Sequence, residues 1–375
     1  MTMKNMLMWD ETLFRDLDTF EIDYIPDQFN YRENQLRELA FLIRPGIKGS
    51  RPLNAILKGT PGTGKTTSVK KIFADIDSIQ SKLLTVHINC QVENTRFMIL
   101  SHIYRQIAGH NPSAAGNSYK RVFESIADIL LAEDRVLLIA LDDANYLLFE
   151  NELNNILYLL LRSHETYPGT RIGVLVVISD MDVDLSRELD IRVSSVFSPT
   201  EVYFPPYSVE ETFQILKERV MQGLYPGVLS DKNLDIIVDH TLRSGDMRVG
   251  IDMIKRAGLN AERDAVREIG EEHIHEAYRI SRFLHLKYSI HALKREEKDL
   301  LRLLTEISRT EEQMTSGEVY KVVKKKLKLG YTIYYEALRK LDTLRLINLE
   351  FRDGRGRTRL INLRYDPDKI LFYLK

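Results

Sequence analysis

The sequence predicts three successive folds: an α/β domain over residues 1–204, an all-helical domain over 205–286, and three helices with a β-hairpin over 287–375. Up to residue 203, short β-rich runs alternate with longer amphipathic stretches, which is typical of a parallel sheet covered by helices. The run FPPYS at 204–208 ends this alternation, and only helix-periodic stretches follow up to residue 286. Near the C-terminus, two β-rich runs are joined by the turn-rich segment RDGRGRT.

The predicted α/β domain begins with a helix over 32–43, in which Leu36, Leu39 and Ile43 share one face. Strands are predicted at 54–58, 83–89, 136–141, 172–178 and 195–203. The helices between them are predicted at 66–76, 95–108, 118–132 and 153–166.

The all-helical domain is predicted to contain helices at 209–221, 231–244, 247–262 and 271–286, with glycines in the connections. The last domain is predicted to contain helices at 290–307, 316–326 and 332–344, with Thr332 as the N-cap of the last one. Strands at 346–351 and 359–364 follow. Three helices and a basic hairpin form the pattern of a winged helix.

Composition limits the classes of protein that the chain can represent. The only cysteine is Cys90, which excludes an internal disulfide and a cysteine-based metal cluster and favours a reducing cytoplasm. No apolar run approaches the roughly 20 residues of a membrane helix, so no membrane partner is expected.

Charge is distributed unevenly along the chain. Residues 287–375 contain 21 Lys and Arg against 13 Asp and Glu, a net +8, which leaves −9 for the rest of a chain of net charge −1. A basic C-terminal domain suggests that contacts with a polyanion concentrate there. An ordinary solvated surface is the alternative explanation of the same charges.

The strongest local signal is the sequence GTPGTGKT at 59–66, which follows the apolar run NAILK and begins a predicted helix. Its glycines let successive backbone N–H groups point at phosphate oxygens, at a helix N-terminus whose dipole favours negative charge. Lys65 is expected to reach the β and γ phosphates of ATP, and the Thr66 hydroxyl to bind Mg²⁺. The predicted nucleotide-binding residues are Gly59, Thr60, Pro61, Gly62, Thr63, Gly64, Lys65, Thr66 and Thr67.

A second signal is the apolar run VLLIAL at 136–141, which ends in Asp142 and Asp143. Such a strand is expected beside the phosphate loop. Asp142 would then hold Mg²⁺ directly or through water, and Asp143 would polarise the water that attacks the γ phosphate.

Further segments extend this pattern over most of the chain. Tyr24-Ile-Pro and Tyr31-Arg-Glu precede the phosphate loop, and VHINCQ, LDDAN, VVISDMD and LDIRVSSVF follow it. SGDMRVGIDMIKRAG lies in the helical domain, and TSGEVY, LRLINLE and GRGRTRLINL lie in the last one. From about residue 24 to 363 the sequence resembles the archaeal origin-recognition and cell-division-control replication initiators. The resemblance implies an α/β AAA+ ATPase domain, an all-α lid and a C-terminal winged-helix DNA-binding domain.

The resemblance also implies roles for individual residues. Asp180 takes the sensor 1 position and Arg248 the sensor 2 position, both near the γ phosphate. Arg192 matches an arginine that is considered a finger toward a neighbouring subunit, with a structural salt bridge as the alternative. The family segment that lies beside the adenine is matched by Tyr24, Ile25 and Pro26. The alternative is that these residues only pack at the N-terminus.

Two positions depart from the family pattern. The usual Asp-Glu pair is Asp142-Asp143 here, and the usual sensor 1 asparagine is Asp180. A shorter carboxylate reaches the water less well, and a charged Asp180 would repel the γ phosphate unless it is protonated or bound to Mg²⁺. Both changes are expected to slow hydrolysis more than binding, which leaves a weak ATPase.

For the winged helix, the resemblance implies double-stranded origin DNA as the partner. The expected DNA-binding residues are Lys324, Lys325, Lys326, Thr332, Arg339, Arg352, Arg355, Gly356, Arg357 and Arg359.

The implied function is an ATP-dependent, nucleoid-associated replication initiator that acts as an ATP/ADP switch. Paralogous initiator subunits and the replicative helicase are further implied partners. One alternative is a DNA-binding regulator that holds ADP as a structural ligand and scarcely turns over. The other is a clamp-loader-like machine, against which the basic hairpin argues.

Overall fold

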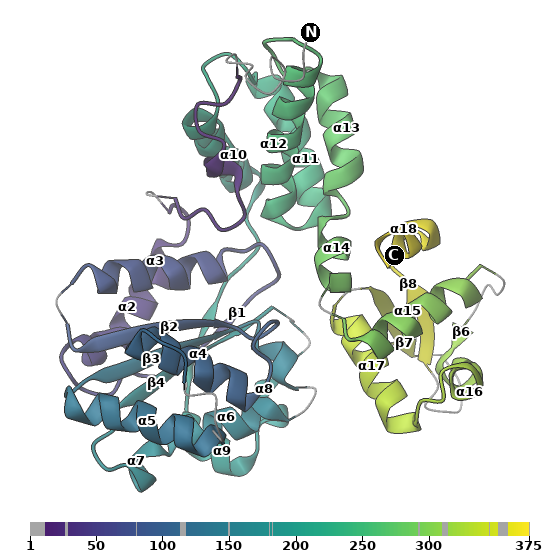
Figure 1. The fold of residues 1–375 in the computed structure, drawn as a ribbon. Coiled ribbons are helices and arrows are strands. Elements are labelled where there is room, and N and C mark those ends of the chain that lie inside the picture. The colour runs from purple at the N-terminus through teal and green to yellow at the C-terminus, as the bar shows by residue number, and fades with distance from the viewer. Residues whose placement is uncertain are drawn as a thin grey trace. The chain divides into compact units, whose positions relative to one another are not determined.

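The computed structural model describes residues 12–374 except 27–28, 80, 113–117, 149–150, 180, 182, 292, 310–313, 345 and 352–358. The chain divides into two compact units, Met1–Ser281 and Arg282–Lys375. The first unit contains an α/β layer structure and a helical bundle, and the second contains helices and a small sheet (Figure 1).

A parallel sheet forms the centre of the α/β part. Its order is β2-β3-β4-β1-β5, and the strands are β1 (Ala55–Lys58), β2 (Leu83–Asn89), β3 (Val136–Asp142), β4 (Ile172–Ile178) and β5 (Thr200–Tyr203). Every residue of β3 and β4 is buried, which explains why both strands are continuous apolar runs. The carboxyl ends of β1, β3 and β4 therefore lie next to one another at one edge of the sheet.

Helices cover both faces of this sheet (Figure 1). On one face, α2 (Glu33–Ile47) and α3 (Lys65–Asp77) pack on Leu57, Leu138 and Ala140. On the other face, Leu137, Ile139 and Leu141 of β3 contact a layer of four helices. These are α4 (Arg96–Ala108), α5 (Tyr119–Ala132), α6 (Glu152–Leu161) and α9 (Ile191–Phe197). Short helices complete this part: η2 (Ala144–Leu148), α7 (Ser163–Thr166) and α8 (Leu185–Glu188).

The helical bundle consists of α10 (Val209–Gly223), α11 (Asp231–Ser244), α12 (Met247–Arg263) and α13 (Glu271–Ser281). A complete capping box at Ser208 and Glu211 fixes the start of α10 immediately after the FPPYS run. The N-terminal segment also belongs to this core, because Phe14 and Phe20, which ends η1 (Asp18–Phe20), pack against Gly258 and Gly223.

The second unit has the winged-helix arrangement that the sequence predicted. It contains α14 (Leu284–His291), α15 (Arg295–Ile307), α16 (Ser316–Lys326), α17 (Tyr331–Thr343) and α18 (Pro367–Tyr373). Its antiparallel sheet has the order β6-β8-β7, formed by β6 (Met314–Thr315), β7 (Ile347–Phe351) and β8 (Arg359–Leu363). The Thr315 side chain caps α16 by accepting from the backbone N–H of Glu318.

Several predicted boundaries were wrong. The strand predicted at 195–203 is only Thr200–Tyr203, because Val193 and Phe197 are buried one helical turn apart on α9. Thr332 is not an N-cap: extended Gly330 precedes α17, and Thr332 lies in the first turn. The helix predicted at 153–166 is divided into α6 and α7 at Arg162. The helices predicted at 271–286 and 290–307 are replaced by α13, α14 and α15.

No helix in the described part of the chain combines the length and the hydropathy needed to cross a membrane. Nor does that part hold a group of three or more His, Cys, Asp or Glu side chains placed to bind a metal ion.

Candidate nucleotide site and DNA-binding surface

The phosphate loop joins β1 to α3 at the carboxyl ends of the strands. Gly62 and Gly64 have φ angles of 75° and 89°, in the left-handed region that favours glycine. A Cβ at Gly62 would collide with Asp246 of the helical bundle, and one at Gly64 would lie 2.7 Å from the Tyr207 hydroxyl oxygen. Gly64 is also the N-cap of α3, so the loop leads directly into a helix N-terminus that can bind an anion.

Lys65 is buried at the start of α3, with 4% of its surface exposed. Its Nζ donates to the carbonyl oxygens of Gly59 at 2.8 Å and Thr60 at 2.9 Å. Burial lowers the pKa of Lys65 to about 8, although the carboxylates of Asp143 and Asp142 oppose that shift. The loop therefore encloses a cation with no ion-pair partner in the described part of the chain, as expected of a site that receives a polyphosphate.

Asp142 ends β3 and is 5% exposed. One carboxylate oxygen lies 2.9 Å from Nε2 of His87 on β2, and the other accepts from the Asp143 backbone N–H at 3.1 Å. These bonds fix the plane of the carboxylate while each oxygen keeps a lone pair for a further ligand.

Asp143 follows in a left-handed conformation, with φ of 53°. Its carboxylate accepts a hydrogen bond from the Ser179 hydroxyl, beyond the end of β4, at 2.9 Å. Burial and then the neighbouring Asp142 raise the pKa of the Asp143 carboxyl. A buried carboxylate with a raised pKa suits the role of a base.

Arg248 enters this neighbourhood from the helical bundle. Asp246 caps α12 by accepting from the Arg248 backbone N–H, and it also holds the guanidinium, with Nη2 to Oδ2 at 2.6 Å. The charge of Arg248 adds to the lowering of the Lys65 pKa that burial causes, and it opposes the rise of the Asp143 pKa. The structure thus brings together Lys65, Asp142, Asp143 and Arg248, which are up to 183 positions apart in the sequence.

Other predicted site residues lie in different surroundings. Asp180 lies outside the described residues. The Arg192 side chain is 71% exposed, and its Nη2 lies 3.6 Å from Asp190 Oδ2, a surface ion pair of the kind that contributes little stability. Tyr24 contacts α10, because the Arg219 guanidinium lies 4.5 Å from its ring centroid. Ile25 is half-buried and Pro26 is buried.

Three residues at the loop were missed from the sequence. The ring of Phe29 and the hydroxyl of Tyr207 border Gly64. Arg32 donates from Nε to the Thr63 carbonyl oxygen at 2.9 Å. The Tyr31-Arg-Glu motif had pointed to Arg32, but its position in the sequence does not predict which groups the side chain contacts.

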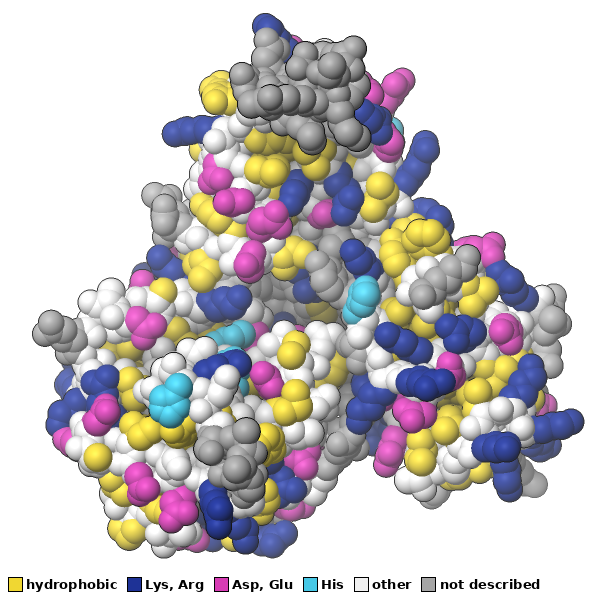
Figure 2. All heavy atoms as spheres, in the orientation of Figure 1, with side chains coloured by type: hydrophobic (Ala, Val, Ile, Leu, Met, Phe, Trp, Pro, Cys, Tyr) yellow, Lys and Arg dark blue, Asp and Glu magenta, His cyan; other side chains and the backbone are white. Residues whose placement is uncertain are grey.

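The predicted DNA-binding residues lie in the second unit, where Lys and Arg side chains gather on the face seen in Figure 2. Lys324, Lys325 and Lys326 form the exposed last turn of α16. Thr332 and Arg339 are exposed on α17, and Arg359 begins β8 half-buried. Four further predictions lie outside the described residues: Arg352, Arg355, Gly356 and Arg357.

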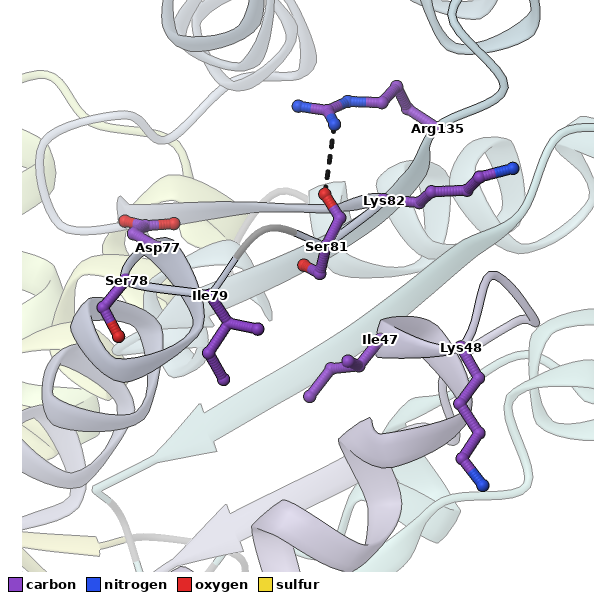
Figure 3. A pocket seen from close by; sticks show the side chains of 8 residues that line it. All are labelled: Ile47, Lys48, Asp77, Ser78, Ile79, Ser81, Lys82 and Arg135. Atoms are coloured by element: carbon purple, nitrogen blue, oxygen red, sulfur yellow. Dashed lines mark hydrogen bonds between the residues drawn. The ribbon is translucent and has the colours of Figure 1, made fainter.

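An open pocket lies at the opposite edge of the sheet from the phosphate loop (Figure 3). Its lining comes from the ends of α2 and α3 and from the residues that precede β2 and β3: Ile47, Lys48, Asp77, Ser78, Ile79, Ser81, Lys82 and Arg135. Because it adjoins the amino ends of the strands, this pocket is separate from the nucleotide site.

Comparisons with known proteins agree with this arrangement. Residues 48–182 match an AAA domain model, and residues 213–279 match a model of the Cdc6 AAA+ ATPase-type lid domain. The chain is 43% identical to ORC1-type DNA replication protein 2 of Methanosarcina mazei, covering 100% of both chains. It is 42% identical to ORC1-type DNA replication protein 6 of Halobacterium salinarum, covering 98% of both.

Solved structures show the same fold. The ORC1 protein of Aeropyrum pernix, determined in complex with DNA, has a TM-score of 0.77 at 24% identity over 97% of both chains. The ORC2 protein of the same organism, determined as ADPNP-ADP complexes, has a TM-score of 0.65 at 25% identity over 96% of this chain and 97% of the other.

The phosphate loop, the paired acids on β3 and the helical lid define an AAA+ ATPase fold with a winged helix. Within that class, the chain belongs to the ORC1-type DNA replication proteins. The family assignment confirms the resemblance predicted from the sequence motifs.

Proposed function

We propose that the protein is an ATP-dependent replication initiator that binds origin DNA and uses nucleotide binding as a conformational switch. The observation that carries the proposal is that Asp246, which holds Arg248 of the helical bundle, lies against Gly62 of the phosphate loop, close to Lys65, Asp142 and Asp143 of the α/β part. A ligand whose phosphates contact both the α/β part and the helical bundle favours the arrangement of the two in which it makes both contacts. Replication relatives at 42–43% identity, and the DNA and nucleotide complexes of the structural neighbours, support the assignment.

The residues present fit a magnesium-bound nucleotide. The glycine cradle and buried Lys65 would hold the β and γ phosphates, with flanking residues 59–64 and Thr67 around them. Thr66 and Asp142 would hold Mg²⁺, which when bound neutralises phosphate charge and orients the γ phosphate. Arg248 would leave Asp246 to reach the γ phosphate, and Asp143 would take the proton of the attacking water.

The DNA contacts are assigned to the second unit. The exposed lysines of α16 are suited to phosphates, and α17 is suited to the major groove. The hairpin arginines 352, 355, 357 and 359 would follow the backbone or enter a minor groove. The other proposed partners are paralogous initiators, toward which Arg192 would act in trans, and the replicative helicase. DNA binding would hold the protein on the nucleoid.

Footprinting on replication origins of the source organism tests the proposal. We expect protection of discrete origin sites, with an extent or affinity that differs between ATP and ADP. Protection that is identical on random DNA, or unchanged by nucleotide, would contradict an origin-specific switch.

Hydrolysis is expected to be limited by the short side chain of Asp143, whose Oδ1 is held by Ser179. Replacing Asp143 with Glu should raise the single-turnover rate by about tenfold, a small part of the roughly 10²–10⁴-fold that a positioned base contributes. Asp143→Asn is the matched control and should keep nucleotide affinity while losing hydrolysis. A slower Asp143→Glu variant would mean that Asp143 is already correctly placed.

The hydrogen bond between Ser179 and Asp143 also supports a second candidate function. If the Ser179-bound carboxylate cannot reach the water, the protein is a DNA-binding regulator that retains ADP as a structural ligand. Single-turnover measurements on the unmodified protein discriminate: no hydrolysis over hours favours the regulator.

A further inference from the structure

Arg32 is the largest fully buried side chain in the described part of the chain, with 2% of its surface exposed. Its three hydrogen bonds all go to backbone carbonyl oxygens: those of Thr63, Tyr31 and Pro205. Burial lowers the pKa of the guanidinium, but from so high an ordinary value that the group stays charged. The Arg32 cation is therefore hydrogen-bonded only to uncharged backbone carbonyl groups.

These carbonyl groups belong to segments that are far apart in the sequence. Nε donates to Thr63 in the phosphate loop at 2.9 Å, and Nη2 donates to Pro205 at 2.7 Å. Pro205 lies between β5 and α10, in the connection that leads from the sheet to the helical bundle. One planar guanidinium thus joins the phosphate loop to the lid connection.

An aromatic contact strengthens this link. The Arg32 guanidinium carbon lies 3.7 Å from the ring centroid of Tyr207, two residues beyond Pro205. The hydroxyl of Tyr207 in turn borders Gly64, the residue that follows Thr63 in the loop. Residues 205–207 therefore contact the loop twice, through Arg32 and through Tyr207.

Stability alone does not account for a buried cation. Desolvating a charge costs several kcal/mol, and a well-packed apolar side chain in such a place is often neutral or stabilising. What an apolar side chain cannot do is donate in fixed directions to carbonyl groups of separate segments, which the guanidinium fork does.

We propose that Arg32 is a positioning residue that couples the phosphate loop to the lid connection at 205–207. The proposal rests on the proposed nucleotide switch and names the contact through which the loop acts on the lid. By holding the Thr63 carbonyl, Arg32 keeps the loop in its binding conformation, so less ordering is needed when phosphates bind. By holding Pro205, it passes any shift of the loop to the start of α10.

The test compares Arg32→Lys, Arg32→Met and the matched control Arg51→Lys. Lysine keeps the charge but cannot span the carbonyl groups, whereas methionine removes the buried charge and keeps the volume. Arg51 also donates to two backbone carbonyls, those of Ile172 and Leu161, but at the opposite edge of the sheet. ATP affinity is measured by calorimetry, and amide hydrogen exchange at 204–208 is measured without ATP and at saturating ATP.

We expect both Arg32 variants to bind ATP roughly tenfold more weakly, since the loop must now be ordered on binding. At saturating ATP, the nucleotide-dependent change in exchange at 204–208 should be lost in these variants and kept in Arg51→Lys. If Arg32→Lys does not fold, the test is made with Arg32→Met alone. Parent-like affinity and a parent-like exchange change in a folded Arg32 variant would overturn the coupling. Failure of the parent to bind ATP would instead remove the proposed switch itself.

Discussion

Replacing Lys65 with alanine should weaken ATP binding by at least about a hundredfold, because two or more charge-assisted hydrogen bonds to phosphate are lost. Glycine-loop N–H groups alone cannot replace a buried cation. The fold should remain: the pKa of Lys65, about 8, lies below its ordinary value of 10.5, so the charged amine costs folding free energy at neutral pH. The thermal midpoint of the variant should therefore be no lower than that of the parent.

The pH dependence of binding provides a second measure of the same lysine. Phosphate beside Lys65 raises its pKa in the complex, so binding takes up a proton at pH above about 8. ATP affinity of the parent should be constant below that pH and fall by up to about tenfold per unit above it. Calorimetric titration should show this fall in the parent and in the control Lys71→Ala, but not in Lys65→Ala. Unchanged affinity in the folded variant would remove Lys65 from the site.

The local motifs explain how much of the site could be predicted. Gly59 to Thr66 lie in one continuous segment, and Asp142 ends an apolar strand, so spacing alone placed them at the same edge of a parallel sheet. The family resemblance added Arg248, which lies 183 positions beyond Lys65 and which no local pattern connects to it.

The rest of the site could not be predicted, because it depends on contacts between segments that are distant in the sequence. The bonds of Arg32 span 31 residues to Thr63 and 173 to Pro205, and no periodicity encodes such separations. His87 and Ser179 support Asp142 and Asp143 only because β2 and β4 are the neighbours of β3, which is a property of strand order. Phe14 and Phe20 likewise belong to the core of the helical bundle although they precede the sheet in sequence.

Short elements with mixed propensity were the other source of error. The segment 191–197 contains Val193 and Val196, β-branched residues that favour a strand. The structure makes it helical because Val193 and Phe197 then bury on one side while Ile191 and Arg192 stay exposed. Tertiary burial therefore decided the conformation over local propensity.

Removing the lysine cluster of α16 should have the largest effect on DNA binding. Lys324, Lys325 and Lys326 are exposed and consecutive in the last turn of the helix, so substitution leaves the core of the winged helix intact. Each phosphate contact contributes about −0.9 to the slope of log affinity against log salt. The triple alanine variant should therefore flatten that slope by about two to three units and weaken binding about a hundredfold near 0.1 M salt.

Fluorescence anisotropy of labelled origin and random duplexes at several salt concentrations measures both quantities. Because phosphate contacts carry no sequence information, both duplexes should lose affinity equally. The control replaces Lys48, Lys70 and Lys71 of the first unit with alanine, which removes the same charge and should change the slope by less than about one unit. ATP affinity should stay at the parent value in the α16 variant, since Lys65 belongs to the other unit. A triple variant that binds both duplexes as tightly as the parent would return the lysines of α16 to an ordinary solvated surface and remove this helix from the DNA interface.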